Sequence, residues 1–235
     1  IPPPHPPQKT QGFRLMPIRL DQRLTAIANL VDYGKVADVG CDHGKLGYYL
    51  VSTDRASEVI ATDISAPSLA KAEELAKENG VQDVMQTRLG NGLEPVGDRE
   101  VDTVIIAGLG GDVISDIVLR AHAQDKKFAH FLLSANTHPE KVRVALQKCG
   151  HTVVFDEMLE CAGKVYTIIK TQEGESNLSD DQILYGAFFK TSENFAYFAK
   201  KEIESMKNVL AHNPKAVELS EKIEKLQAAL DKNEG

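Results

Sequence analysis

The chain has 235 residues, of which 42% are hydrophobic and 26% charged, and its formal net charge at pH 7 is −7. This composition is typical of one soluble globular domain with a small appendage; it weighs against a surface that is basic throughout, although one basic face remains compatible. No apolar run approaches the roughly 20 residues that cross a bilayer, so we expect no transmembrane helix and no membrane partner.

The three cysteines, Cys41, Cys149 and Cys161, are far apart in the chain and form no CxxC pair. This spacing argues against a zinc site and against a disulfide scaffold. We therefore expect no bound metal and a reducing, cytoplasmic environment.

The first fifteen residues, IPPPHPPQKTQGFRL, are rich in proline and lack periodicity, and the composition changes from Met16 onward. We interpret residues 1–15 as a leader ahead of a native start, with a disordered native arm as the alternative. From residue 20 to residue 31 apolar residues recur at helical spacing, and Asp21 suits the beginning of that helix. Arg19 and Arg23 would project beside the glycine loop that follows, unless they belong to a solvated helix face.

Strand-like and helix-like segments alternate from there onward. Strands are predicted at residues 36–40, 58–63, 84–89, 101–107 and 130–135, and helices at residues 45–51, 65–79, 112–122 and 139–149. Residues 152–159 and 164–171 are predicted to form an antiparallel hairpin around Cys161-Ala162-Gly163. This order predicts an α/β sheet with helices on both faces and right-handed crossovers. An antiparallel end is more typical of methyltransferase sheets than of dinucleotide dehydrogenases.

The C-terminal part has a different texture. Residues 171–181 are polar and resemble a linker, and residues 183–210 are predicted to be helical, with an early aromatic cluster. His212-Asn213-Pro214 breaks that helix, and Leu219, Ile223, Leu226 and Leu230 then follow coiled-coil spacing. We expect a helical hairpin, or short coiled coil, over residues 173–235, appended to a sheet domain over residues 16–172.

Residues 35–44, KVADVGCDHG, form the centre of the predicted site. A buried strand enters a tight loop and a helix follows, an arrangement that cradles nucleotide-like ligands. A dinucleotide fingerprint has glycine where Asp42 stands, because pyrophosphate approaches the backbone closely. A carboxylate repels pyrophosphate but accepts a hydrogen bond from an ammonium group, so S-adenosylmethionine (SAM) is favoured over NAD. The candidate cofactor-binding residues of this loop are Asp38, Gly40, Cys41, Asp42 and Gly44; a tight loop that merely caps the next helix is the alternative.

The next two strand ends extend the candidate site. Asp63 lies about 20 residues beyond the loop, where such folds hold a ribose diol, and charge-assisted hydrogen bonds suit that contact. Ile64 would lie against the adenine. Gly90, Asn91 and Gly92 can present backbone and amide groups to the adenine edge, although Asn-Gly is also a common turn pair.

The fourth strand ends at Ala107 and Gly108, which we also assign to the cofactor site. Many amino-group methyltransferases place an Asn/Asp-Pro-Pro-aromatic clamp here, whereas this chain continues Gly108-Leu109-Gly110-Gly111. Such a loop brings the backbone close to the transfer site but cannot stack a base. Another element must therefore do so.

These motifs resemble the bacterial TrmK-type tRNA (adenine-N1)-methyltransferases from Met16 to the C-terminus. The resemblance rests on Arg23-Leu24, on Asp38-Val39-Gly40-Cys41-Asp42-His43, on the glycine-rich residues 107–111 and on the helical tail. It implies a class I, Rossmann-like, SAM-dependent methyltransferase fold, SAM as cofactor with S-adenosylhomocysteine (SAH) as product, and N1 of adenine 22 in the D-arm region of tRNA as acceptor. The family tends to have Gln-Pro-Asn after the fifth strand, where this chain has Ser134-Ala135-Asn136.

Residue roles follow from the chemistry of that reaction. Adenine N1 has a lone pair and can attack the sulfonium methyl without prior deprotonation, so the enzyme mainly aligns the reactants and stabilises the cationic base. Asp42 is the candidate for that stabilisation, and His43 and Asn136 are further catalytic candidates that would orient the base. For RNA binding the candidates are Arg19, Arg23, Lys200, Lys201 and Lys207, with a solvated helix face as the alternative for the lysines.

Three alternatives remain open from the sequence. The first keeps SAM but changes the acceptor to another RNA or a small molecule, which the acidic composition favours. The second is an NAD-dependent oxidoreductase, for which Tyr197 and Lys201 have a Tyr-xxx-Lys spacing, although their aromatic neighbours indicate a core helix. The third is a non-catalytic SAM-binding module. A monomer and a tRNA partner are preferred, and no DNA partner is expected.

Overall fold

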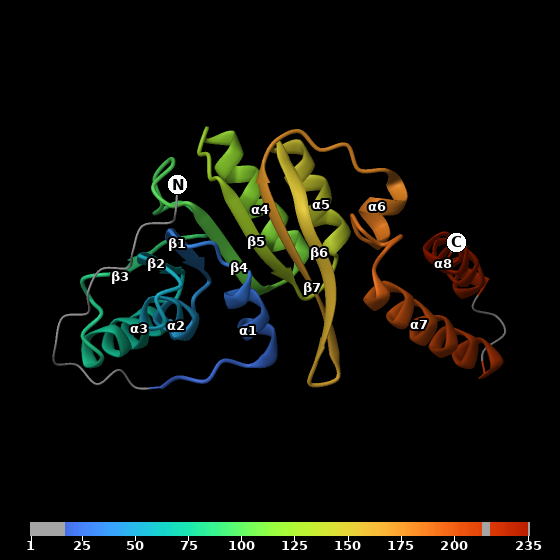
Figure 1. The fold of residues 1–235 in the computed structure, drawn as a ribbon, viewed down its shortest axis with the longest axis horizontal. Coiled ribbons are helices and arrows are strands. Elements are labelled where there is room, and N and C mark those ends of the chain that lie inside the picture. The colour runs from blue at the N-terminus through green and yellow to red at the C-terminus, as the bar shows by residue number, and fades with distance from the viewer. Residues whose placement is uncertain (1–16, 213–216, 235) are drawn as a thin grey trace.

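A computed structural model describes residues 17–212 and 217–234; the predicted leader lies outside the described residues. A seven-stranded sheet in the order β3-β2-β1-β4-β5-β7-β6 runs through the centre of the protein (Figure 1). Its strands are β1 (Lys35–Val39), β2 (Glu58–Asp63), β3 (Met85–Leu89), β4 (Thr103–Leu109), β5 (His130–Ala135), β6 (His151–Cys161) and β7 (Lys164–Glu173). The first five strands are parallel and β7 is antiparallel to both β5 and β6, as the strand pattern predicts.

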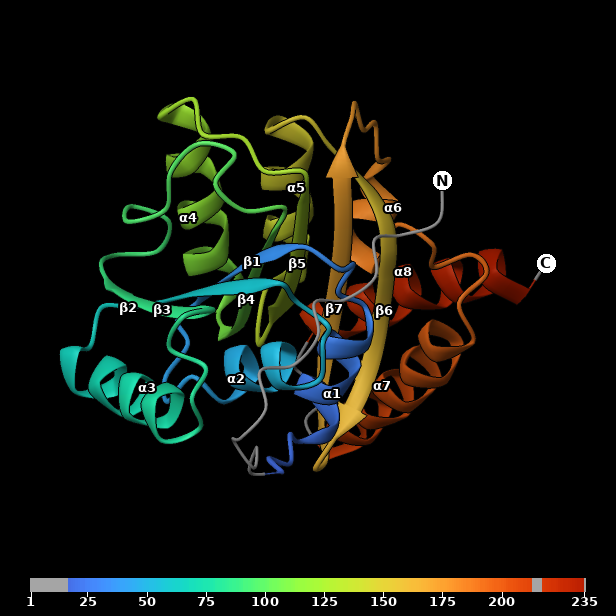
Figure 2. The ribbon, with the colours of Figure 1, turned by 60° about the vertical axis from the view of Figure 1, so that its left-hand side comes forward.

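Helices cover both faces of the sheet. They are α1 (Gln22–Asn29), α2 (Lys45–Ser52), α3 (Ala66–Glu78), α4 (Gly111–Ala123) and α5 (Pro139–Lys148). Side chains alternate along the parallel strands: Ile105 packs with α1, α2 and α3, whereas Val104 and Ile106 pack with α4 and α5. Figure 2 shows the helices on the two faces of the sheet from a second direction. The four inner parallel strands β1, β2, β4 and β5 are mostly buried, so their sequences are largely apolar rather than alternating, whereas the edge strand β3 is more polar and more exposed.

The predicted helix ends are confirmed where side chains cap them. Asp21 accepts a hydrogen bond from the Leu24 backbone at 2.7 Å and begins α1. Ser65 accepts one from the Ser68 backbone and begins α3, with proline in the first turn. An N-cap oxygen satisfies a backbone N–H that the helix itself leaves without a partner.

The ends of β4 and of the two hairpin strands differ from the prediction. β4 continues to Leu109, with an irregularity at Gly108 (φ +89°) that shifts its register against β5. The hairpin strands are longer than predicted, because only Ala162 and Gly163 form the turn, at φ +51° and +76°. Two consecutive residues with positive φ match the right-handed twist of a hairpin, and this lets the pairing continue into Cys161.

The predicted single helix over residues 183–210 is wrong. The chain instead forms α6 (Asp180–Tyr185) and α7 (Glu193–His212), followed by α8 (Val217–Glu234). A capping box between Ser179 and Gln182 begins α6 inside the predicted linker, and Gly186 at φ +123° ends it. A residue at this φ cannot continue a helix, so the chain turns before Ser192, whose side chain accepts a hydrogen bond from Phe195 N.

The tail packs partly on itself and partly on the edge of the sheet. Leu226 and Leu230 of the predicted seam are buried against α7, together with Phe189 and Phe195. Tyr197 is 57% exposed, so the expectation that its aromatic neighbours place it in a core is wrong. Met158 of β6 joins the same apolar cluster, and α7 runs beside β6 (Figure 2). None of the helices in the described part of the chain is long and apolar enough to cross a membrane.

A buried ion pair joins the sheet domain to α6. The Arg143 guanidinium of α5 donates to both carboxylate oxygens of Asp156 on β6, at 2.6 and 3.0 Å, and each side chain is 1% exposed. Arg143 also donates to the Ile183 carbonyl, and Asp156 accepts from the Ala187 backbone. The pair thus supplies hydrogen bonds to backbone groups on both sides of the Gly186 turn.

Arg143→Met should lower the free energy of unfolding by about 3–5 kcal/mol, because it leaves the Asp156 charge buried without its partner. Urea unfolding monitored by circular dichroism measures this loss. Adding Asp156→Asn to Arg143→Met should recover part of it, since a neutral amide oxygen still accepts from Ala187. A double variant as unstable as Arg143→Met would contradict this explanation.

Candidate active site

The loop after β1 is held in shape by backbone hydrogen bonds to the end of β2. Gly40 N and Cys41 N both donate to the Thr62 carbonyl, at 2.8 and 3.0 Å. Gly44, at φ +69°, begins α2, and a Cβ on it would lie 2.7 Å from Ala72 Cβ and from Met85 Cε. Glycine is therefore required at this position both by the backbone conformation and by the neighbouring side chains.

The Asp63 carboxylate closes the same loop. Its Oδ2 accepts from Asp42 N at 3.0 Å, and its Oδ1 accepts from Ser65 N at 2.8 Å. Each carboxylate oxygen has a second lone pair for another donor. The side chain is thus fixed at the tip of β2, where it can accept hydrogen bonds from two hydroxyl groups.

Asp38 lies at the base of the loop and is 4% exposed. Burial raises its pKa to about 7 and nearby Asp63 adds to the rise, while a hydrogen bond from Gly47 N acts in the opposite direction. Burial likewise raises the pKa of the Cys41 thiol, with Asp38 and Asp63 contributing. Cys41 is therefore an uncharged wall of the loop.

Asp42 and His43 stand at the open side of the loop. The Asp42 side chain is 75% exposed, and one of its carboxylate oxygens lies 3.4 Å from His43 Nε2. The same imidazole nitrogen lies 3.1 Å from Lys71 Nζ on α3. Asp42 adopts φ +51°, a region that Asp and Asn tolerate better than most residues. Its carboxylate is consequently accessible to a ligand in the loop.

Two apolar side chains flank Asp63 on the open side. Ile64 is 74% exposed, and Leu89, the residue paired with Asp63 in the sheet, is 61% exposed. Exposed aliphatic groups at adjoining strand tips are suited to the faces of a planar ring. Gly90 N donates to the Asp63 carbonyl, which places the exposed Asn91 beside this flank.

A second cluster lies at the end of β4. Asn136 Nδ2 donates to the Gly108 carbonyl at 2.7 Å, and Asn136 Oδ1 lies 3.5 Å from an Arg23 guanidinium nitrogen. The Arg23 guanidinium lies 4.9 Å from the centre of the Tyr166 ring on β7. A Cβ on Gly108 would lie 3.4 Å from the same guanidinium. The glycine loop, Ala107 included at its start, therefore leaves room for Arg23, and Tyr166 supplies the aromatic ring that the loop lacks.

The remaining RNA-binding candidates are exposed side chains outside this cluster, in the segment before α1 and on α7. Arg19 is exposed in the segment before α1. On α7, Lys200 forms an ion pair with Glu234, Lys201 with Glu160 of β6, and Lys207 is exposed. Exposed pairs of this kind contribute little to stability and exchange readily. Within residues 17–212 and 217–234, no three His, Cys, Asp or Glu side chains gather as metal ligands would.

Sequence reasoning missed Tyr166, Leu89 and Lys71. Leu89 carries a local signal, because an aliphatic residue directly before Gly90 ends a strand at the sheet edge where ligands bind. Tyr166 and Lys71 carry none, since they approach Arg23 and His43 only through the pairing of β7 with β5 and the packing of α3.

Comparisons with known proteins identify relatives of similar length. A family model described as a methyltransferase domain matches residues 20–169. The tRNA (adenine(22)-N(1))-methyltransferase of Bacillus subtilis is 26% identical over 226 residues, which cover 92% of this chain and 95% of that protein. A Streptococcus pneumoniae protein solved in complex with SAM is 28% identical with a TM-score of 0.80, and the match covers 90% of this chain and 100% of that one. M. capricolum TrmK in complex with SAH is 25% identical with a TM-score of 0.78, over 91% and 98% of the two chains.

Asp38 should make the stability of the protein depend on pH. A carboxyl whose pKa is higher in the folded than in the unfolded protein binds a proton more tightly in the folded state. Its contribution to the free energy of unfolding therefore falls as the pH rises from about 4 to about 7. The free energy of unfolding of the native protein, measured against Asp38→Asn in urea, should therefore fall by about 2–3 kcal/mol between pH 5 and pH 8. A difference that stays constant across this range would contradict the assignment.

Proposed function

We propose that this chain transfers a methyl group from SAM to N1 of adenine 22 of tRNA. It belongs to the family of methyltransferase domains, and within that family to the TrmK-type enzymes. The observation that carries the proposal is the loop after β1, in which Asp63 holds the Asp42 backbone so that the Asp42 carboxylate stands at the open side. A negative charge at this point suits a ligand with ammonium and sulfonium groups. It does not suit a pyrophosphate.

The residues around this loop fit SAM in size and in chemistry. Asp63 would accept hydrogen bonds from both ribose hydroxyls, because each of its oxygens keeps a free lone pair. Ile64 and Leu89 would contact the adenine ring, and Asn91 would face its polar edge. Gly40 and Gly44 would let the backbone approach the methionine part of the molecule, as their positive φ angles and missing side chains allow.

SAM supplies an electrophilic methyl group on its sulfonium. The lone pair of adenine N1 forms the new N–C bond while the S–C bond breaks, so the chain needs no base to remove a proton first. Its task is to align the acceptor and to balance the positive charge that moves onto the base. We assign the charge balance to Asp42, with His43 beside it, because this carboxylate is exposed at the open side of the loop.

The cluster at the end of β4 would hold the acceptor. Both ends of the Asn136 amide are already engaged, with Gly108 and with Arg23, so we assign Asn136 to positioning that loop. Arg23 and Tyr166 would hold the target nucleotide once it has left its stack, which costs a few kcal/mol. Stacking on an aromatic ring or on a guanidinium would return about 1–3 kcal/mol of that cost.

We assign backbone binding of the tRNA to Arg19 and to the exposed lysines of α7. Two lines of support are available. Lys201 is tied to Glu160 near the tip of the β6–β7 hairpin, and Tyr166 lies on the partner strand of that hairpin, so this part of α7 lies beside the hairpin that carries Tyr166. An exposed ion pair opens readily, which lets a phosphate replace Glu160.

We further propose that the protein works as a cytoplasmic monomer, because one chain supplies all the cofactor and acceptor residues named above. Residues 16–172 would form the SAM-binding domain and residues 173–235 the helical domain. The Arg143–Asp156 pair, which joins them, supports close cooperation between the two parts rather than independent motion.

The acceptor assignment is tested by radiolabel transfer from SAM to an unmodified tRNA transcript. We expect label on the native transcript and at least a 100-fold lower rate on a transcript in which adenine 22 is replaced by guanine. A transcript that differs at a neighbouring adenine serves as the matched control and should be labelled normally. Equal labelling of all three transcripts would contradict the position.

Asp42→Asn should lower kcat about 100-fold and should also raise the Kd for SAH, because in the proposed complex the same carboxylate faces the ammonium group of the cofactor. Asparagine keeps the shape and tolerates the positive φ, so this variant removes only the charge. Single-turnover methylation and calorimetry with SAH separate the two quantities. A raised Kd with an unchanged kcat would assign Asp42 to cofactor binding instead of to the transition state.

A further inference from the structure

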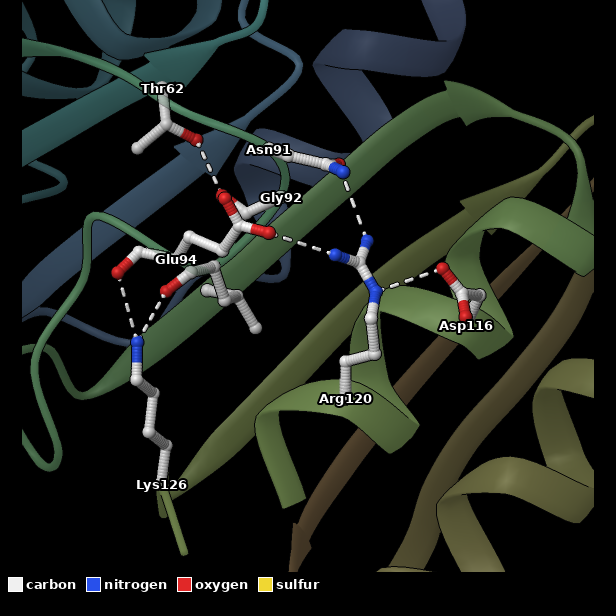
Figure 3. A network of polar contacts seen from close by, with 8 residues as sticks. Thr62, Asn91, Gly92, Glu94, Asp116, Arg120 and Lys126 are labelled. Carbon is white, nitrogen blue, oxygen red and sulfur yellow. Dashed lines mark hydrogen bonds and ion pairs between the residues drawn. The ribbon is translucent and has the colours of Figure 1, made fainter. Parts of the chain in front are cut away.

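The loop that carries Asn91 is tethered by two cationic side chains, Arg120 of helix α4 and Lys126 of the segment that follows it, as Figure 3 shows. The Arg120 guanidinium lies under the loop, and the Lys126 ammonium group donates to the Leu93 and Glu94 carbonyls at 2.9 and 3.0 Å. On the other side, Thr62 Oγ1 donates to the Gly92 carbonyl at 3.1 Å. The loop is thus held at the same time to β2 and to the region of α4 and the segment after it.

Arg120 uses each of its three guanidinium nitrogens on a different acceptor. Nε donates to Asp116 at 2.9 Å, one terminal nitrogen donates to Glu94 at 3.0 Å, and the other donates to Asn91 Oδ1 at 3.2 Å. Two carboxylates therefore fix the plane of the guanidinium and offset its charge. The third nitrogen donates to a side chain that we assign to the adenine edge of the cofactor.

This contact has a chemical consequence for Asn91. A guanidinium can only donate, so the amide oxygen must face Arg120 and the amide cannot turn over. An amide that is free to rotate can exchange the positions of its NH2 and its carbonyl, so it can pair with the donors and acceptors of adenine or with the reversed ones of hypoxanthine. An amide that is held in one orientation pairs with only one of these two arrangements.

We propose that Arg120 is a positioning residue that makes the cofactor site selective for adenine over hypoxanthine. The inference rests on the proposed function, since it requires an adenine-containing cofactor beside Asn91. Adenine presents a ring acceptor at N1 and an amino donor at C6, and hypoxanthine presents the opposite pair. If hypoxanthine replaces adenine, the held amide therefore faces a donor with its NH2 group or an acceptor with its oxygen, and either contact is unfavourable. Turning the amide over would relieve it, and Arg120 prevents that.

Lys126→Met provides a matched control. Arg120→Met and Lys126→Met each remove a cation that holds the same loop, one on α4 and one just after it, and both replacements keep an unbranched apolar stem. Lys126 bonds only backbone carbonyls among the loop atoms, so its loss loosens the loop without freeing the Asn91 amide. A merely structural role for Arg120 would make the two variants behave alike.

The test compares the binding of SAH and of S-inosylhomocysteine by calorimetry. We expect native protein to bind SAH at least tenfold more tightly than the inosine analogue, and Lys126→Met to keep that ratio even if both affinities fall. Arg120→Met should reduce the ratio to about twofold, because the freed amide turns over to suit hypoxanthine. Asn91→Ala should also reduce it with Arg120 still present, which tests the inference if Arg120→Met fails to fold.

Two outcomes would overturn the inference and are distinguishable. If Arg120→Met keeps the native ratio, Arg120 does not set the selectivity, while the proposed methyltransferase function stands. If the native protein binds neither molecule, the cofactor assignment fails and this inference fails with it.

Discussion

The candidate site depends on the hydrogen bonds that join the loop after β1 to the end of β2. The Thr62 carbonyl accepts from two successive loop amides, and the next residue, Asp63, accepts from a third. These bonds require the loop to bend sharply, which Gly40 and Gly44 permit at φ +72° and +69°. They also fix a carboxylate at the strand tip without using all of its acceptor capacity. The same few atoms thus shape the loop and prepare the cofactor site.

The acceptor side of the site depends on a position that has no side chain, Gly108. Gly108 interrupts β4 and leaves space that Arg23, from the first helix, enters. Asn136 then holds the Gly108 carbonyl on one side and meets Arg23 on the other. Because Tyr166 reaches the cluster from β7, the antiparallel end of the sheet takes part in the site as well as closing the fold.

Most of the sheet could be predicted from the sequence, because buried parallel strands are short apolar runs bounded by glycine and turn residues. The ligand class of the loop after β1 could also be predicted, since Asp42 stands where a phosphate-binding loop has glycine. The break between α6 and α7 could not be predicted, because the apolar pattern continues across the turn and the helix ends at the backbone angle of Gly186. The contacts of Arg23 with Tyr166 and of Arg120 with Asn91 could not be predicted, because they join residues 143 and 29 positions apart through tertiary packing.

A site built in this way methylates N1 of an adenine in tRNA. Mass spectrometry of the nucleosides released from unmodified tRNA after incubation with the protein and SAM detects this reaction most directly. We expect 1-methyladenosine, formed at up to one residue per tRNA and absent when SAM is omitted. Methylation of another base, of a ribose or of the exocyclic amine of adenine, with no 1-methyladenosine, would contradict it.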